Sequence, residues 1–353
     1  MIYMLTTADQ MCLEDFLGGR GSAFARHLVS VPYSAVFGAS ELPPATYVFA
    51  DLERLSGADL ERAARVWRQL ASRGAAVRLL NDPAQVKQRF ELLRTLRERG
   101  LNDFDVYRLD EGRTPGRFPV FVRSERGHDA VASDLLEDAP ALAQFVRRWR
   151  AQGHPLSDTV VTEFCGEPDE RGLYRRYAAF RVGDRILPTD IFFARHWEVR
   201  GLAGTLVVDE HTLDEEARFL RDNPHEAQLR EVFDLACIDY GRVDYGLVGG
   251  RVQVYEINTN PYVAPGPLGG GRRAALYEHF ARDFLSALHG LRGPDGAAPL
   301  SVEPVAVGAE LREWARREWF GVLWRGGPGQ AYARRFRLTR RWAQRGRRLR
   351  GGA

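Results

Sequence analysis

Cysteine is scarce in this sequence of 353 residues, where only Cys12, Cys165 and Cys237 occur. Three scattered cysteines provide neither a disulfide framework nor the closely spaced ligands of a zinc site. Each is expected to be a small core residue, and their low number suits a reducing compartment. These features argue against a secreted protein stabilised by disulfides and against a zinc protein.

Long apolar runs are also missing. No stretch reaches the roughly 18–20 apolar residues that span a bilayer, and the N-terminus, Met1–Thr6, lacks the basic residues that begin a signal peptide. We therefore expect a cytoplasmic protein whose first residues form a strand. With 44% hydrophobic and 27% charged residues, the chain is expected to fold into two or three packed subdomains.

The small net charge of +3 is unevenly distributed. Residues 301–353 contain 13 Arg and 4 Glu, a net charge of +9, so the rest of the chain carries −6. Trp314, Trp319 and Phe320 predict that this tail packs on the protein through apolar burial. The sequence leaves open a weak contact of the tail with a membrane surface and the formation of a homodimer. It predicts no specific nucleic-acid partner.

The first 82 residues have the pattern of an α/β unit. Tyr47–Ala50 is a predicted strand, Ser56 can cap a helix that ends near Gly74, and Ala75–Leu80 is a second strand. A strand, a helix and a strand at this spacing predict a parallel, Rossmann-like sheet. The Gly-x-Gly-x-x-Gly pattern of dinucleotide-binding proteins follows none of these strands.

A polar set interrupts a predicted hairpin. Two β-rich runs, Val243–Val248 and Val252–Ile257, flank a Gly-Gly pair. Within and just after them lie Asp244, Glu256 and Asn258, whose hard oxygens suit Mg²⁺ completed by phosphates. A strict two-residue loop would place Asp244 and Glu256 on opposite faces. Joint ligation of a metal therefore predicts an odd loop or a β-bulge in this hairpin.

At these residues the chain resembles a known family. Arg242-Val243-Asp244, then Glu256-Ile257-Asn258-Thr259 and Pro261, is similar to the last motif of ATP-grasp ligases such as D-alanine–D-alanine ligases. The resemblance implies an α/β fold in which two α+β subdomains grip ATP, here preceded by the Rossmann-like unit. It implies that Asp244, Glu256 and Asn258 hold Mg²⁺, with Mn²⁺ as the alternative, and that Arg242 supports the transferring phosphoryl group.

The resemblance also implies a division of the chain. Residues 1–82 would form the N-terminal domain and residues 83–292 the ATP-grasp domain. Within the latter, the lid would span about 100–163 and the core about 164–292. Residues 293–353 are predicted to be a linker followed by the basic aromatic tail.

Two cations are candidates for a phosphate contact before the lid. Asn81-Asp82-Pro83 predicts the start of a helix that continues to Gly100. The family often places a lysine soon after such a helix begins, and here Lys87 or Arg89 is the candidate. The residue pattern alone does not choose between them.

The predicted lid strand departs from the family twice. Phe118–Arg123 ends in Arg123 where the family has a lysine that contacts the ATP phosphates. Arginine keeps the charge and adds a planar fork that matches phosphate. The following loop contains a single glycine, Gly127, and so offers a thinner backbone cradle for phosphate.

Thr159–Glu167 resembles the hinge between lid and core of the family. The resemblance implies that backbone groups of Phe164 and Cys165 read the adenine edge, and that Glu163 or Glu167 takes the ribose hydroxyls. A second predicted hairpin follows at Tyr174–Phe193. On it Arg176, with Arg175 as the competing choice, would meet a phosphate or the carboxylate that is activated.

The resemblance implies an ATP- and Mg-dependent ligase that joins a carboxylate to an amine, or to a thiol, through an acylphosphate. Arg242 and Arg176 would be its catalytic residues, and its substrates small molecules or peptides with these groups. Two alternatives stay open. One is an ATP-grasp phosphotransferase that stops at the phosphorylated product. The other is a nucleotide-binding protein without turnover, which Arg123 and the thin loop favour and the intact metal set opposes.

Overall fold

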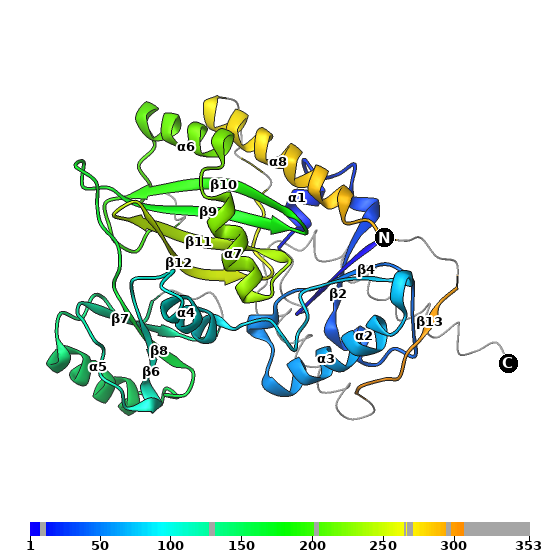
Figure 1. The fold of residues 1–353 in the computed structure, drawn as a ribbon, viewed down its shortest axis with the longest axis horizontal. Coiled ribbons are helices and arrows are strands. Elements are labelled where there is room, and N and C mark those ends of the chain that lie inside the picture. Colours follow the sequence, from blue (N-terminus) through cyan, green and yellow to red (C-terminus); the bar gives the residue numbers. More distant parts are fainter. Residues whose placement is uncertain are drawn as a thin grey trace.

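The computed structural model describes residues 1–7, 12–126, 131–200, 205–264, 266, 271–293 and 298–306. Gly127 and the tail aromatics Trp314, Trp319 and Phe320 lie outside these residues. Within the described part of the chain, no helix is long and apolar enough to cross a membrane. Figure 1 shows three groups of elements, each built around a sheet.

The N-terminal group is the predicted parallel sheet, and the prediction is confirmed. Its strand order is β2-β1-β4-β5, and all three neighbouring pairs run parallel. The predicted cap is also present, because the Ser56 side chain accepts a hydrogen bond from the Asp59 N–H at the start of α3. The elements are β1 (Ile2–Thr6), α1 (Glu14–Gly18), β2 (Leu28–Pro32), α2 (Tyr33–Phe37), β3 (Glu41–Leu42), β4 (Thr46–Phe49), α3 (Gly57–Ala71) and β5 (Arg78–Leu80).

The second group is a small antiparallel sheet with the order β6-β8-β7. Among the described residues, its hydrophobic cluster contains four buried residues, Tyr107, Val120, Val122 and Val161, with Leu142 and Phe145 of α5 packed against them. A cluster of this size is consistent with a subdomain that depends on its neighbours for stability. The elements are β6 (Val106–Arg108), β7 (Val120–Ser124), α5 (Ala139–Ala151) and β8 (Thr159–Glu163).

The third group is a four-stranded antiparallel sheet with the order β10-β9-β11-β12. Both predicted hairpins are confirmed as β9–β10 and β11–β12. The helix α8 joins this sheet to the N-terminal unit, because Phe284 contacts both Phe16 and Phe180. The elements are α4 (Arg89–Glu98), β9 (Tyr174–Val182), β10 (Arg185–Ala194), α6 (Glu210–Asp222), α7 (Glu226–Ala236), β11 (Tyr240–Val248), β12 (Arg251–Asn258) and α8 (Arg272–Gly290).

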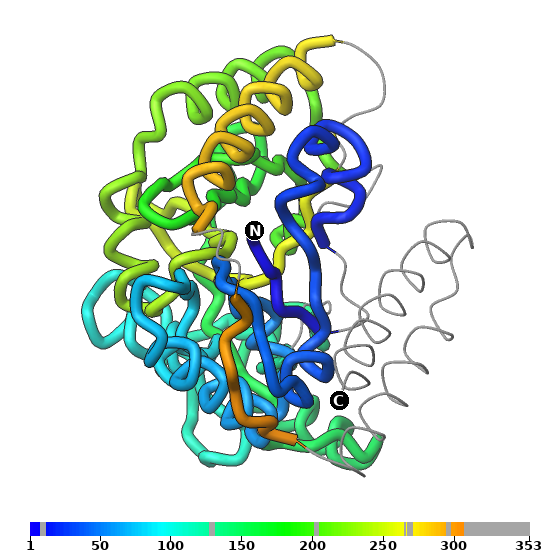
Figure 2. The backbone as a smooth tube through the Cα atoms, turned by 90° about the vertical axis from the view of Figure 1, so that its right-hand side faces the viewer, coloured from blue at the N-terminus to red at the C-terminus, as the bar shows by residue number. Residues whose placement is uncertain are grey.

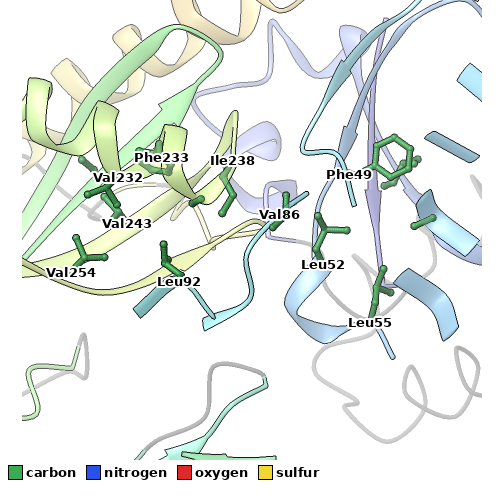
Figure 3. Packing of buried hydrophobic residues seen from close by; sticks show 14 of the residues in the cluster. Phe49, Leu52, Leu55, Val86, Leu92, Val232, Phe233, Ile238, Val243 and Val254 are labelled. Carbon is green, nitrogen blue, oxygen red and sulfur yellow. The ribbon is translucent and has the colours of Figure 1, made fainter. Parts of the chain in front are cut away.

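One hydrophobic core runs through two of these groups. Phe49 and Leu52 of the N-terminal unit, Val86 of the connecting segment and Phe233 and Val243 of the third group belong to one cluster of buried residues. Figure 3 shows Val86 between the N-terminal residues and the residues of α7, β11 and β12. The parallel sheet is therefore packed onto the sheet that carries the polar hairpin.

The predicted helix start at Asn81-Asp82-Pro83 is wrong. The helix α4 begins at Arg89, with Gln88 as its N-cap. Asn81 is fully buried in the left-handed conformation at φ +64°, which asparagine tolerates better than most residues. Its side chain donates to the Phe49 and Tyr240 carbonyls, and its Oδ1 accepts from the N–H groups of Asp239 and Tyr240. Asn81 thus clasps the end of β4 to the start of β11.

The chain returns to the N-terminal unit after α8. β13 (Leu300–Ser301) pairs antiparallel with β3, and Figure 2 shows this orange segment beside the blue N-terminal part. Val302, Val305 and Ala306 are buried in the large core. Residues 293–353 were predicted as a linker and tail, but 298–306 form part of the packed fold.

Candidate active site

A β-bulge shapes the hairpin β11–β12, as predicted. Val248 pairs with Arg251 across a two-residue loop, yet Asp244 pairs with Glu256, because the register shifts between Asp244 and Tyr245. The extra residue is Tyr255, whose ring lies over Gly246. A Cβ atom built on Gly246 would lie 2.1 Å from the Tyr255 hydroxyl oxygen, so a larger residue would disturb the bulge. The bulge places the two carboxylates opposite one another on the same face.

Four arginines surround this carboxylate pair. Arg242 Nε lies 3.0 Å from Asp244 Oδ1 and its Nη2 lies 3.3 Å from Asp244 Oδ2. Arg176 Nη1 lies 3.5 Å from Asp244 Oδ2. On the neighbouring strand, Glu256 Oε2 accepts from Arg89 Nη2 at 2.5 Å and from Arg123 Nη2 at 2.9 Å. The candidate residues of five separate elements, α4, β7, β9, β11 and β12, therefore meet at one point.

The cluster is partly desolvated, which strengthens its electrostatic interactions. The side chain of Asp244 is 5% exposed and that of Glu256 is 16% exposed. Burial opposes the charge on Arg242, but Asp244 and Asp190 raise its pKa above the ordinary value. Burial lowers the pKa of Arg89, an effect that Glu256 counteracts.

A cavity of about 600 Å³ opens beside these residues, between the small sheet and the four-stranded sheet. Its apolar part includes Phe121, Phe164 and Trp197, with ring centroids 5.2 Å apart for Phe121–Trp197 and 5.7 Å apart for Phe164–Trp197. Its polar part includes Arg123, Arg176, Arg242, Asp244, Glu256 and Asn258. One end suits a planar ring and the other a group with several negative charges.

Lys87 and Arg89, the two candidate cations that precede the lid in the sequence, have different surroundings in the structure. Lys87, the sole lysine of the sequence, pairs with Glu91 through a 3.0 Å contact and does not line the large cavity. Arg89 is buried and donates to Glu256 and to the carbonyls of Ser124 and Glu125. Arg89 therefore connects the end of β7 to the hairpin β11–β12, whereas Lys87 makes no contact with this carboxylate pair among the described interactions.

The hinge residues fall at the cavity, but they are not equivalent. Glu163 is 4% exposed, and its carboxylate accepts from Tyr107 Oη at 2.8 Å and from the N–H groups of Asp105 and Gly116, both at 3.0 Å. These hydrogen bonds hold the Glu163 carboxylate against the residues around β6 and Gly116. Glu167 is exposed on the rim, where it accepts from the Gly249 N–H at 3.1 Å.

Phe164 and Cys165 line the cavity in the hinge position. The Phe164 N–H donates to the Pro119 carbonyl at 2.9 Å, and the Cys165 carbonyl accepts from the Tyr255 hydroxyl at 3.3 Å. The bulged residue Tyr255 thus connects the segment after β8 to the hairpin β11–β12. Sequence reasoning predicted an odd loop or a bulge in this hairpin but missed this contact, which depends on residues 90 positions apart.

The neighbouring arginines of β9 have different surroundings. Arg175 donates to Glu215 at 2.7 Å and 2.9 Å and contacts Asp169 at 2.8 Å. Arg176 stacks over the Phe192 ring, 4.8 Å from its centroid, and reaches Asp244. Of the two choices, Arg176 is the one that joins the carboxylate cluster.

One acidic residue of this face was missed. Asp190 is in register with Ala178, and Ala178 is in register with Asp244. Three carboxylates, Asp190, Asp244 and Glu256, therefore stand in one row across the sheet. Burial raises the pKa of Asp190, while Arg242 and Arg176 oppose that shift. An acidic residue within the apolar strand β10 was the available signal.

The donor set fits Mg²⁺ better than a soft metal. Among the described residues, no group of three or more His, Cys, Asp or Glu side chains could hold a metal by itself. The two opposed carboxylates and the Asn258 amide offer only oxygen, and Asn258 Oδ1 accepts one bond, from the Asn260 N–H at 2.9 Å. Such a set leaves coordination positions for water and phosphate, which is the usual arrangement for Mg²⁺.

No family model and no curated protein matches this sequence. Among solved structures, a D-alanine–D-alanine ligase from Bacillus anthracis complexed with ATP is 12% identical, with 82% of this chain and 98% of that chain covered and a TM-score of 0.44. A RimK domain protein ATP-grasp from Sphaerobacter thermophilus is 18% identical, with 79% and 98% covered and a TM-score of 0.45. The VanG D-Ala:D-Ser ligase from Enterococcus faecalis is 11% identical, with 82% and 98% covered and a TM-score of 0.46. These are structures to which the chain is similar at low sequence identity; the chain itself has an α/β fold with a parallel N-terminal sheet and antiparallel sheets.

Proposed function

We propose that this protein is an ATP- and Mg²⁺-dependent ligase that activates a carboxylate as an acylphosphate and joins it to an amine or a thiol. The observation that supports this most directly is the carboxylate pair Asp244–Glu256, brought face to face by a bulge and surrounded by four arginines at a large cavity. A hairpin with ordinary surface carboxylates has no need for that bulge or for buried arginines.

The nucleotide would lie along the cavity. Its base would pack against Phe164 and Trp197 beside the hinge, because planar rings stack favourably on aromatic side chains. Glu167 is the proposed ribose contact, since the carboxylate of Glu163 is already held by donors of the lid. The phosphates would then reach Arg123 at the charged end.

At that end, Arg242 and Arg176 are the proposed catalytic residues. A substrate carboxylate oxygen would attack the terminal phosphorus, and the bond to ADP would break. Both guanidinium groups face the site of charge transfer, where fixed positive charge stabilises a phosphoryl group in flight. Mg²⁺ held by Asp244, Glu256 and Asn258 would neutralise charge on the phosphates. Attack by the amine or thiol on the acyl carbon would then release inorganic phosphate.

The test is Mg²⁺-dependent turnover by Asp244→Asn and Glu256→Gln, measured as ADP release with pooled acids and amines and mass detection of products. We expect a loss of at least about 100-fold in each variant with an unchanged circular dichroism spectrum, because each removes a charged ligand. Glu98→Gln, on an exposed helix position paired with Arg94, is the matched control and should keep wild-type turnover. Wild-type activity in either site variant would overturn the metal assignment. A stable phosphate ester as the product would replace the ligase by a phosphotransferase.

A further inference from the structure

We infer that Arg123, Arg176 and Arg242 exchange partners when nucleotide binds. Without nucleotide they occupy the two carboxylates, so a divalent cation binds tightly only together with the nucleotide phosphates. This inference rests on the proposed function, but it concerns the order and coupling of binding rather than the reaction. It is carried by how the arginine donors are distributed over the carboxylate oxygens.

The oxygens that a cation would use already accept hydrogen bonds. Glu256 Oε2 receives two guanidinium groups at once, from Arg89 at 2.5 Å and from Arg123 at 2.9 Å. A carboxylate oxygen has about two lone-pair sites, so both sites of Oε2 are in use. Both oxygens of Asp244 are also engaged, at 3.0 Å and 3.3 Å by the two donors of Arg242. A cation that takes Glu256 Oε2 as a ligand can bind only after one of the two contacts to this oxygen opens.

The local charge adds a second obstacle. Four guanidinium groups face this carboxylate pair and the neighbouring Asp190, so positive groups outnumber acidic groups around the pair. The side chains of Arg89 and Asp244 are only 6% and 5% exposed, so water screens this excess poorly. A divalent cation that enters alone meets net repulsion, whereas a cation that arrives with a triphosphate does not.

The arginines have donors left for phosphate. Nε of Arg123 and Nε of Arg176 are buried and make no hydrogen bond, although guanidinium groups normally use their fork of donors. Both side chains, and Arg242, line the cavity beside the carboxylates. Phosphate oxygens placed there would attract the guanidinium groups away from Asp244 and Glu256 and would leave carboxylate oxygens for the cation. The same residues then serve first as counter-ions of the carboxylates and later as phosphate ligands.

The experiment measures Mn²⁺ binding to the full-length protein from the loss of the free-ion electron paramagnetic resonance signal. It is done with and without a non-hydrolysable ATP analogue. For wild type we expect the analogue to tighten Mn²⁺ binding by about ten-fold or more. Arg123→Gln removes one of the two cations on Glu256, so it should tighten Mn²⁺ binding without nucleotide by about ten-fold. It should also weaken binding of the analogue.

Two further variants keep the result interpretable. Arg176→Gln tests the same effect on Asp244 if Arg123→Gln proves unfolded by circular dichroism. Arg200→Gln is the matched control, because Arg200 lines the same cavity but contacts Glu198 at 3.7 Å. It should leave nucleotide-free Mn²⁺ affinity unchanged. A gain limited to the first two variants supports the exchange.

The outcome separates this inference from the proposed function. Equal Mn²⁺ affinity with and without the analogue, in a protein that binds the analogue, would overturn the exchange and leave the ligase proposal standing. Weaker Mn²⁺ binding in Arg123→Gln would also overturn it, because the arginine would then support the metal site. A protein that binds no nucleotide, yet gains Mn²⁺ affinity in both variants, would refute the proposed function while the competition between arginine and cation stands.

Discussion

Replacement of Asn81 by alanine should destabilise the protein strongly, although the residue lies outside the cavity. The side chain is 0% exposed and makes four hydrogen bonds to backbone groups, two on Tyr240 and one each on Phe49 and Asp239. Alanine would leave these buried groups without their partner, at about 1 kcal/mol each. Alanine also lacks the short polar side chain that makes a positive φ acceptable for asparagine. At the observed φ of +64°, this loss costs about 1 kcal/mol more. The expected loss is about 5 kcal/mol.

The matched control is Asn102→Ala. Asn102 is also 0% exposed, but its side chain makes two backbone hydrogen bonds, both to Val254. Its φ is not positive, so the expected loss of unfolding free energy is only about 2 kcal/mol by the same reasoning. Both variants and the wild type are compared by guanidinium unfolding of the full-length protein, followed by circular dichroism.

The ratio of the two losses decides the outcome. If Asn102→Ala costs as much as Asn81→Ala, the number of buried backbone partners is not what matters. If Asn81→Ala lowers the unfolding free energy by less than about 1 kcal/mol, water or a local shift supplies hydrogen bonds to the four backbone groups, and the Asn81 side chain does not stabilise the fold. Nucleotide affinity gives a second readout, because the clasped residue Tyr240 begins the strand that carries the site. We expect Asn81→Ala to weaken it.

Three other outcomes follow from the structure. Lys87→Gln should leave nucleotide affinity unchanged, whereas Arg123→Ala should weaken it by about ten-fold and Arg123→Lys should retain part of it. Titration calorimetry of the three variants measures these affinities. An affinity of Arg123→Ala equal to that of wild type would show that the lid strand was assigned wrongly. Burial raises the pKa of Asp51 from 3.8 to about 7. Its contribution to stability is therefore complete below about pH 4 and is lost as the pH rises through about 7. The unfolding free energy of wild type relative to Asp51→Asn should fall over that pH window, and a difference that does not change with pH would contradict this expectation. A chain that ends after Pro304 lacks the buried residues Val305 and Ala306. It should melt at a lower temperature than a chain that ends after Gln330, which should show wild-type turnover. Equal melting temperatures would refute the packing of that segment.

Local sequence determined much of the fold. The alternation of side chains and the Gly-Gly pair fixed the hairpin that carries Asp244 and Glu256, because turn chemistry and a period of two act over a few neighbouring residues. The same arithmetic predicted an odd loop or a bulge, since only a shifted register puts the two carboxylates on one face. The bulge is present at Tyr255. The parallel N-terminal sheet followed from strand and helix spacing in the same way.

Part of the site was also evident from residue types in order. The sequence predicted Arg123 and Arg242 as cations of one site, together with Arg89 or Lys87 and Arg176 or Arg175; in the structure Arg89, Arg123, Arg176 and Arg242 contact the carboxylate pair. The sequence did not decide between Lys87 and Arg89 or between Arg175 and Arg176. Arg175 and Arg176 are chemically identical, and only the positions of Glu215 and Asp244 on other elements separate their partners.

Tertiary structure alone decided the roles of Asn81, Lys87 and Glu163. An Asn-Asp-Pro run is a sound helix start by local rules, but Asn81 bonds to Tyr240, 159 positions away, and its helix begins later. Glu163 is held by the lid residues around Tyr107, 56 positions away. Residues 298–306 return to β3 across the length of the chain. In each case the deciding partner lies far beyond the few residues over which periodicity, capping and turn chemistry act, so no local pattern could specify it.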